Sequence, residues 1–339
     1  MKKTWIFSLF FGFCGSFLFA SGVEIMAQTV DIKITTVQMR HQQMGLGIER
    51  LAKYSQEKLK DKVRIRTYPA AQLYTGQEEI QAVIKGEIQM AFVIGSILEL
   101  VDPTQELRNL PFFFPNIDVC YKFYEGPLGK KLFAKLEEKG LLVLGTVSSG
   151  NVSISNNKVL LKRPEDFRGL KMRSYGRMGA ASLKALGAVS IVTASEETYS
   201  ALQQGVIDGL TTPSSVFLAR KYYDIQKFVT DGGMLNATMV GMTANKAWWN
   251  NLPADVRAGL SESIQRLVQE QRAEMEVQNK KIFDQIAAKG CQVYYLSSDE
   301  QMALKKALQA VYEEFSPKIG MDFVKEAQQE VERLSKPKK

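Results

Sequence analysis

The residues best suited to hold an anion lie in one short stretch of this sequence, residues 163–175. Within it, residues 164–169 combine a proline, two acidic residues and a closing glycine, which predicts one tight helical turn. Residues 170–175 then predict a short strand that places Arg173 just before a glycine-containing loop. Open α/β sheets bind their ligands at such strand ends. Arg173 is therefore the candidate for binding an anionic ligand, and the alternative is an ordinary surface arginine.

Few other residues offer catalytic or metal-binding chemistry. The 339 residues include one histidine, His41, and three cysteines without a CxxC pair, so no zinc site of the common kinds is expected. A Ser-His-Asp triad would need His41, and no nucleophile-elbow motif accompanies it. Arg50 stands where a dinucleotide-binding loop beginning at residue 45 needs its third small residue. We expect no catalytic residue, no metal and no cofactor. An exported enzyme with a carboxylate, lysine or tyrosine as general base is the alternative.

Residues 1–27 predict a signal peptide. Lys2 and Lys3 precede an apolar run over residues 5–20, which is short for a membrane span, and small residues follow at 20–22 and at Ala27. An uncleaved anchor is the alternative. Cys14 lacks the small preceding residue that is typical of a lipidated cysteine. We therefore expect export to the periplasm and cleavage of the signal peptide.

The chain is mildly basic, with 44 basic and 36 acidic residues and a net charge of +8. The basic residues are scattered and no nucleic-acid-binding motif accompanies them, so we expect no nucleic-acid partner. Residues 335–339 form a basic tail that is expected to be solvated. An oxidising compartment permits a disulfide between Cys120 and Cys291, but nothing in their spacing demands one, and two buried thiols are preferred.

The first half of the mature sequence alternates strands with helices. Strands are expected at residues 31–37, 63–67, 88–94 and 141–147, and helices at residues 42–59, 76–85 and 121–139. The strand at 88–94 is almost entirely apolar, which indicates a parallel sheet covered on both faces. The aromatic segment 110–115 is expected either to pack against this sheet or to stack on a ligand.

The second half repeats this organisation, with strands expected at residues 170–175, 188–192 and 206–212 and helices at 179–186 and 195–204. A set of four residues recurs in both halves with the same mutual spacing. The set is Glu78, Ala82, Gly86 and Ile88 in the first half, and Glu197, Ala201, Gly205 and Ile207 in the second. Each set describes a helix that ends at a glycine and leads into a buried strand. The sequence therefore predicts two similarly built α/β lobes.

A long helix is predicted over residues 254–289. At 1.5 Å per residue it would be about 50 Å long, longer than one lobe is wide, so we expect it to brace both lobes or to be kinked between them. A coiled-coil dimer is the alternative, but the heptad pattern breaks at Gln271 and Gln278. A strand at 292–295 and helices at 299–315 and 320–334 complete the chain.

Motifs spread over essentially the whole mature chain resemble one known family. They occupy residues 68–73, 79–92, 110–114, 125–129, 164–173, 199–209 and 221–228. In order and spacing these segments are similar to the extracytoplasmic solute receptors of tripartite ATP-independent periplasmic (TRAP) transporters, the DctP type.

The resemblance implies a two-lobed α/β periplasmic binding protein with a hinge and a long C-terminal helix that braces both lobes. Lobe I would contain residues 28–150 and about 237–275, and lobe II residues 151–236 and about 276–334. The implied partners are a small organic acid and the small and large integral membrane subunits of a TRAP transporter, with the receptor itself a monomer. A receptor that feeds a signalling partner instead of a transporter is the alternative.

The resemblance also implies where the ligand binds. The arginine that pairs with the ligand carboxylate in the family falls on Arg173, and the amide that follows the Asp-Gly strand falls on Thr212. First-lobe pocket positions fall on Gln38, Phe92, Gly95 and Ser96. Asn151 and Ser153 occupy the region where some members have a second arginine, Ser195 lies where some members have an aromatic residue, and Tyr175 shares the strand face of Arg173.

The single arginine sets an expectation for the ligand. A guanidinium holds one carboxylate through two parallel charge-assisted hydrogen bonds. Because the remaining pocket positions are apolar or hydroxyl-bearing, we expect a monocarboxylate with a modest apolar or hydroxylated body. We expect this class ahead of a dicarboxylate or a sialic acid.

Overall fold

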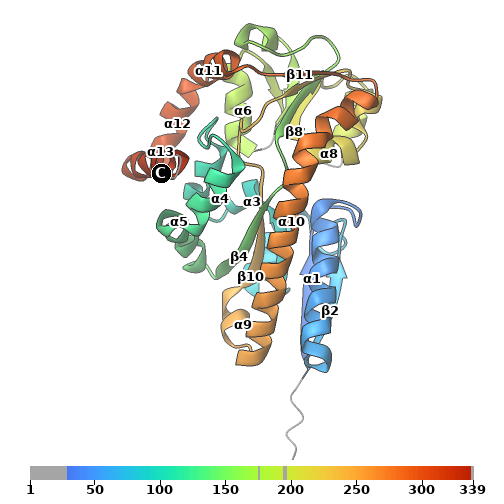
Figure 1. The fold of residues 1–339 in the computed structure, drawn as a ribbon, viewed down its shortest axis with the longest axis vertical. Coiled ribbons are helices and arrows are strands. Elements are labelled where there is room, and N and C mark those ends of the chain that lie inside the picture. The colour runs from blue at the N-terminus through green and yellow to red at the C-terminus, as the bar shows by residue number, and fades with distance from the viewer. Residues whose placement is uncertain (1–28, 175, 194–196, 337–339) are drawn as a thin grey trace, which may run out of the picture.

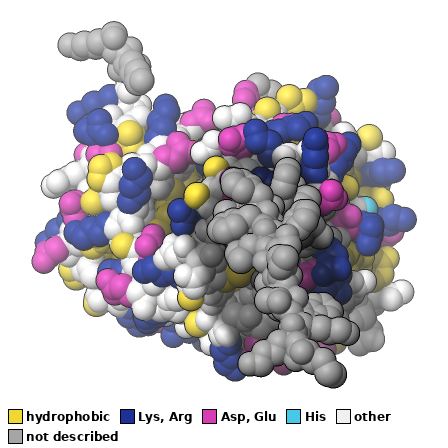
Figure 2. Space-filling model, turned by 90° about the horizontal axis from the view of Figure 1, so that it is seen from below, with side chains coloured by type: hydrophobic (Ala, Val, Ile, Leu, Met, Phe, Trp, Pro, Cys, Tyr) yellow, Lys and Arg dark blue, Asp and Glu magenta, His cyan; other side chains and the backbone are white. Residues whose placement is uncertain are grey.

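The computed structural model describes residues 29–174, 176–193 and 197–336, in which two β-sheets, each flanked by helices, form two lobes (Figure 1). The predicted signal peptide, Tyr175 and Ser195 lie outside the described residues. None of the described helices is both long and apolar enough to cross a membrane. Basic and acidic side chains alternate over the face seen in Figure 2.

The first lobe contains a five-stranded sheet in which parallel and antiparallel strands are mixed. Its strands, in spatial order, are β2 (Val63–Tyr68), β1 (Val30–Thr35), β3 (Met90–Ile94), β10 (Met239–Asn245) and β4 (Leu141–Ser148). The strands β1, β2 and β3 are parallel, so their carboxyl ends meet at one edge, whereas β10 runs antiparallel to both of its neighbours. This lobe also contains α1 (Gln43–Leu59), α2 (Gly76–Lys85), α3 (Gly95–Leu98), α9 (Lys246–Asn250) and the 3-10 helices η1 (Lys60–Lys62) and η2 (Pro103–Asn109).

The second lobe contains a six-stranded sheet. Its order is β11 (Gln292–Tyr295), β9 (Phe228–Asp231), β5 (Val152–Asn156), β8 (Gly209–Pro213), β6 (Lys171–Arg173) and β7 (Val189–Ile191). Its helices include α6 (Gly176–Ala185), α7 (Thr198–Gln203), α8 (Ser214–Ala219), η3 (Pro164–Phe167) and η4 (Tyr222–Asp224). The tight turn predicted at residues 164–169 is therefore present as η3, with Gly169 in the left-handed region at φ 72°.

Besides the long segment between β10 and β11, two short segments connect the sheets. The chain crosses from β4 to β5 over residues 149–151 and returns from β9 to β10 over residues 232–238. The two crossings are hydrogen-bonded to each other, because Ser149 N donates to Thr238 O at 2.8 Å and the Thr238 hydroxyl donates to the carbonyl oxygen of Gly150. The two crossings therefore lie side by side between the lobes.

The long helix α10 (Ala254–Ala288) braces both lobes, as the sequence predicted. It packs on α1 and β4 of the first lobe and on α8 and β11 of the second, and Figure 1 shows it running along both. Its 35 residues correspond to about 52 Å of helix.

Two helices that the sequence predicted as continuous are each divided in the structure. The helix expected at 121–139 is α4 (Ile117–Glu125) followed by α5 (Pro127–Glu137), because Gly126 is extended and Pro127 begins a new helix at its first position. The helix expected at 299–315 is α11 (Ser298–Ala307) followed by α12 (Gln309–Ile319).

The C-terminal helices pack on elements of both lobes. Helix α12 contacts η2 and α6, and α13 (Met321–Ser335) contacts α4. Their apolar faces join the buried cluster that contains Phe113, Phe114 and Phe123, so the aromatic segment 110–115 packs in a core. The lobe boundaries given above remain a proposal. Cys120 and Cys291 are both buried free thiols.

Candidate ligand-binding site

A cavity of about 820 Å³ lies between the lobes. In the first lobe it is lined by residues 37–39 and 42, 70–71, 75–78, 94–97 and 109, which include the segments that follow β1, β2 and β3. The lining is completed by crossing residues 149 and 236–238, by residues 152 and 239–240 at the starts of β5 and β10, and by second-lobe residues 179, 211–213, 216 and 220. The cavity therefore lies where ligands bind open α/β sheets, at the carboxyl ends of strands.

Two glutamine side chains of the first-lobe wall are oriented by the backbone. The Oε1 atom of Gln38 accepts a hydrogen bond from Met44 N at 2.8 Å, near the start of α1, and Oε1 of Gln42 accepts one from Met39 N at 2.8 Å. A backbone N–H can only donate, so the carbonyl end of each amide is fixed there. Each NH₂ group therefore remains as a hydrogen-bond donor for a ligand in the cavity.

A buried guanidinium lies behind the cavity wall at Gly95. The Nε atom of Arg108 donates to Gln105 O at 2.9 Å, and Nη2 donates to Gln105 Oε1 at 3.0 Å. A Cβ atom on Gly95 would lie 2.8 Å from Arg108 Nη1 and 2.6 Å from Met239 O, so the wall has no room for a side chain. Glycine here brings the cavity close to a positive charge.

The N-terminus of α2 also reaches the cavity through residues 75–78. Thr75 N donates to Glu78 Oε2 at 3.0 Å, and the Thr75 hydroxyl donates to the same oxygen at 2.8 Å. These hydrogen bonds, from the backbone first, lower the pKa of Glu78. The first-lobe wall therefore carries an ionised carboxylate beside its neutral donors.

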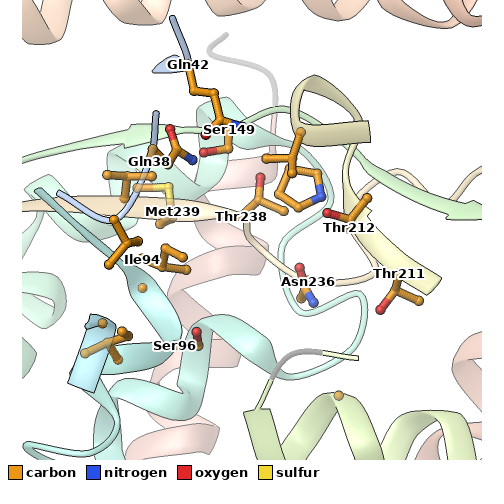
Figure 3. Close-up of a pocket in the computed structure, with 18 of the residues that line it drawn as sticks. Gln38, Gln42, Ile94, Ser96, Ser149, Thr211, Thr212, Asn236, Thr238 and Met239 are labelled. Atoms are coloured by element: carbon orange, nitrogen blue, oxygen red, sulfur yellow. The ribbon is translucent and has the colours of Figure 1, made fainter. Parts of the chain in front are cut away.

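The second-lobe wall includes two hydroxyl-bearing residues of β8. Thr211 and Thr212 both line the cavity (Figure 3), and the Oγ1 atom of Thr212 is buried without a hydrogen-bond partner in the described chain. The neighbouring hydroxyl of Ser153 donates to Thr212 O at 2.9 Å instead. A buried hydroxyl without a partner is costly, so it is suited to bonding a ligand atom.

Arg173 lies at the end of β6, beside this wall. It pairs with Leu210 of β8, directly before Thr211, and is 2% exposed. Its guanidinium donates to Thr193 O from Nε at 3.3 Å and from Nη2 at 3.4 Å. It is not among the residues that line the cavity as the structure has it. Its assignment to the ligand carboxylate remains a prediction.

The structure thus brings four of the predicted site residues together around the cavity, Gln38, Gly95, Ser96 and Thr212. Three others lie elsewhere. Phe92 is fully buried in the first-lobe core, facing Gly47 of α1. Asn151 donates from Nδ2 to Asp231 Oδ1 at 3.3 Å in the first crossing, and Ser153 is the buried hydroxyl described above. Tyr175 and Ser195 are outside the described residues.

Several lining residues were missed by sequence reasoning. Figure 3 shows Asn236 and Thr238, from the second crossing, at the cavity together with Gln42 and Ser149. Arg220, next to the end of α8, is a cation in the lining. These residues lie in loops or at helix ends, where periodicity gives no signal. The one sequence signal that could have suggested Arg220 is its short separation, along the chain, from the strand predicted at 206–212.

No group of three or more histidine, cysteine, aspartate or glutamate side chains in the described part of the chain could hold a metal ion. The cavity offers amide and hydroxyl groups, with arginines in or behind its walls. Such a site can bind and orient an oxygen-rich anion.

Two α/β lobes joined by paired crossings, with a cavity between them that presents polar groups on both walls, define the class of two-lobed solute-binding proteins. The sequence matches the family model of the bacterial extracellular solute-binding proteins, family 7 (DctP), over residues 34–318. The chain therefore belongs to the DctP family of TRAP solute-binding proteins.

Comparisons with individual proteins agree with this assignment. The C4-dicarboxylate-binding periplasmic protein DctP of Rhodobacter capsulatus is 31% identical over 310 residues, which cover 90% of this chain and 92% of the relative. A TRAP solute-binding protein of Ralstonia eutropha H16 with bound (S)-2-acetolactate is 26% identical with a TM-score of 0.84, over 89% of this chain and 99% of that one. A second TRAP solute-binding protein, from Sulfurospirillum deleyianum with bound succinate, is 29% identical with a TM-score of 0.80, over 88% of this chain and 98% of that one.

Proposed function

We propose that this protein is an exported, periplasmic receptor that captures an organic acid between its lobes and delivers it to TRAP membrane subunits, without chemically changing it. The observation that carries the proposal is the 820 Å³ interlobe cavity, with fixed amide donors on one wall and hydroxyls beside a buried arginine on the other. Oriented neutral donors and a guanidinium together complement a carboxylate that bears hydroxyl or carbonyl oxygens.

The ligand would act by stabilising a closed arrangement of the lobes. It would contact both walls, so its affinity for the closed form would exceed that for the open form, and binding would shift the population toward closure. Small-angle scattering should show a smaller radius of gyration at saturating ligand with no change in molecular mass. An unchanged radius, with binding demonstrated by calorimetry, would contradict closure.

Within this class we propose a monocarboxylate with a modest apolar or hydroxylated body. Arg173 would bind the carboxylate, and Gln38, Gln42 and Thr212 would bind the oxygens of the body. The acetolactate-bound protein of Ralstonia eutropha shows that a related fold takes such a ligand.

The test is to identify the ligand directly. Native mass spectrometry of the exported protein would detect any co-purifying acid. Calorimetry would then compare matched pairs of equal carbon number, such as butyrate with succinate and 2-hydroxybutyrate with malate. Tighter binding of the monocarboxylates is expected. Much tighter binding of the dicarboxylates would exclude this ligand class while leaving the receptor function intact.

A dicarboxylate is the second candidate, favoured by Arg220 in the cavity lining. With Arg173 for one carboxylate and Arg220 for the other, the second lobe would supply two cations. The names of the Rhodobacter capsulatus relative and of the succinate-bound structure agree with this candidate. Arg220→Gln separates the candidates. If a second carboxylate binds at Arg220, the variant should bind succinate more weakly and butyrate as the wild type does.

A further inference from the structure

One amide in the cavity wall is held by a buried carboxyl group. Asn109, the last residue of η2, lines the cavity, and its Nδ2 atom donates to Glu99 Oε2 at 3.2 Å. Glu99 follows α3 and is 5% exposed. The carboxyl group therefore contacts the side-chain amide of a residue that lines the cavity.

The charged groups around Glu99 come from two elements. Glu106 and Arg108 belong to η2 of the first lobe, and Arg177 belongs to α6 of the second. Arg177 Nη2 lies 3.0 Å from Glu106 Oε1, and a Cβ atom on Gly176 would lie 2.9 Å from Glu99 Oε1. The Glu99–Asn109 pair therefore lies where the start of α6 meets the first lobe.

This environment favours the neutral form of the carboxyl group. Burial, and then the nearby Glu106 carboxylate, raise the pKa of Glu99 to about 7, although Arg108, Arg177 and the Asn109 amide act in the opposite direction. Burial also raises the pKa of Glu106, which Arg177 counteracts. Glu99 consequently changes its charge near neutral pH, behind the wall of the cavity.

We propose that Glu99 is a positioning residue for Asn109, and that the protein binds an anionic ligand more tightly when Glu99 carries a proton. An ionised carboxylate only accepts hydrogen bonds, so it holds the Asn109 NH₂ group and leaves Oδ1 as the polar atom available to a ligand. A protonated carboxyl group donates to Oδ1 and leaves the NH₂ group for the ligand instead. This inference rests on the proposed function, since it takes the ligand to be an anion.

The sign of the pH dependence follows from linkage. When Glu99 is protonated, a carboxylate ligand faces an N–H donor and a neutral Glu99. When Glu99 is ionised, the ligand faces a carbonyl oxygen and a second negative charge, so it binds the protonated state more tightly. Binding should therefore raise the proton affinity of Glu99, and by reciprocity protonation should raise the affinity for the ligand. The dissociation constant should increase as the pH rises through 7, a range in which simple carboxylic acids stay ionised.

The experiment measures calorimetric dissociation constants from pH 6 to pH 8 for the tightest-binding acid of the panel. The wild-type constant is expected to rise about fivefold or more across this range. Glu99→Gln, which removes the titrating group, should give a flat profile. Asn109→Ser keeps the titrating carboxyl group but removes the amide, and should give a weaker dependence than the wild type. Glu106→Gln keeps the Glu99 carboxyl group and should keep a pH dependence, with its midpoint moved to lower pH because a carboxylate that raises the pKa of Glu99 is removed. A Glu99→Gln profile parallel to wild type would overturn the proposal.

A second readout needs no ligand. The side-chain amide signals of Asn109 in a ¹⁵N–¹H correlation spectrum, assigned with Asn109→Ser, should shift with a midpoint near pH 7 in the wild type and not in Glu99→Gln. Signals that do not shift between pH 6 and pH 8 would overturn the coupling by themselves. Failure of every acid to bind at any pH would instead contradict the proposed function, so the two failures are distinguishable.

Discussion

The unit α2–Gly86–β3 of the first lobe and the unit α7–Gly205–β8 of the second share a backbone plan and differ in chemistry. Both helices end at a left-handed glycine, with φ 78° at Gly86 and 70° at Gly205. Both strands end at the cavity and lead into a short helix, α3 or α8.

The side chains at matching positions are different. Counted from the two glycines, Phe92 and Val93 in the first lobe correspond to Thr211 and Thr212 in the second. The first pair is fully buried in apolar clusters, and the second pair lines the cavity. The first lobe takes its polar contacts from other segments, at Gln38, Gln42 and Asn109. A repeated backbone unit thus fixes where the cavity lies, whereas the side chains around it determine which wall carries charge.

The largest loss of ligand affinity is expected when Arg173, the proposed cation beside the second-lobe wall, is removed. Arg173→Ala is expected to weaken binding of the preferred carboxylate by about 2–5 kcal/mol, the range for truncating one partner of a buried charge pair. Calorimetry measures the effect, with the exposed Arg168→Ala in the same lobe as the matched control. Wild-type affinity in Arg173→Ala would mean that the carboxylate binds elsewhere.

The second-largest loss of affinity is expected when the amide of Gln38, in the first-lobe wall, is replaced by a carboxylate. Gln38→Glu keeps an oxygen to accept from Met44 N but replaces the NH₂ donor with a negatively charged oxygen. Affinity for an anion should fall by about 1.5–3 kcal/mol, the range for a hydrogen bond to a charged group. Thermal unfolding should change little.

The control for this substitution is Gln56→Glu, on the exposed side of α1. It makes the same chemical change away from the cavity, so its affinity should equal that of the wild type. Equal losses in the two variants would indicate a long-range charge effect and not a contact from Gln38.

The shared backbone plan predicts equal costs at the two glycines. Gly86→Ala and Gly205→Ala should each lower the free energy of unfolding by about 1–2 kcal/mol, because a Cβ atom disfavours the left-handed conformation. At Gly205 a Cβ atom would meet nothing within 4 Å, and at Gly86 it would lie 3.6 Å from Asn245 Nδ2, an ordinary contact. Urea unfolding measures both, and a large cost at one site alone would show that the two units are not equivalent.

The smallest loss of affinity is expected when β8 is given the side chain that β3 has at the matching position. Thr212→Val introduces the residue found at the matching position 93 and should weaken ligand binding by about 0.5–1.5 kcal/mol, the net value of one hydrogen bond. Stability should be unchanged or higher, because the hydroxyl that is removed has no partner within the described chain.

Thr230→Val gives the opposite pattern and serves as the control. The Thr230 hydroxyl donates to Leu161 O at 2.9 Å inside the second lobe. Its removal should lower stability without changing affinity. A stability loss in Thr212→Val, with unchanged affinity, would remove this hydroxyl from the proposed site.

The sequence predicted most of the fold, because its signals are local. Helix α2 has the predicted bounds, and α10 differs from its prediction by one residue. The break at Gly126–Pro127 was missed, although a proline that begins a helix is a readable signal, because the apolar spacing continues across it.

The site was harder to predict. No spacing marks Gln42, Asn109 or Asn236 as a site residue, and only the folded chain brings them to one cavity. Phe92 was expected at the site because the family resemblance placed a first-lobe pocket position there, but alternation along β3 turns its side chain toward α1 and into the core. The identity of the ligand depends on contacts that no residue pattern encodes.

The position of β10 has a consequence for how the chain matures. This strand lies between β3 and β4, so the N-terminal sheet lacks a central member until residue 245 has emerged. Until then the edges of β3 and β4 are open, and such edges invite pairing with other chains. During synthesis, the first lobe must therefore wait for five of the six strands described for the second sheet before it can complete its own sheet.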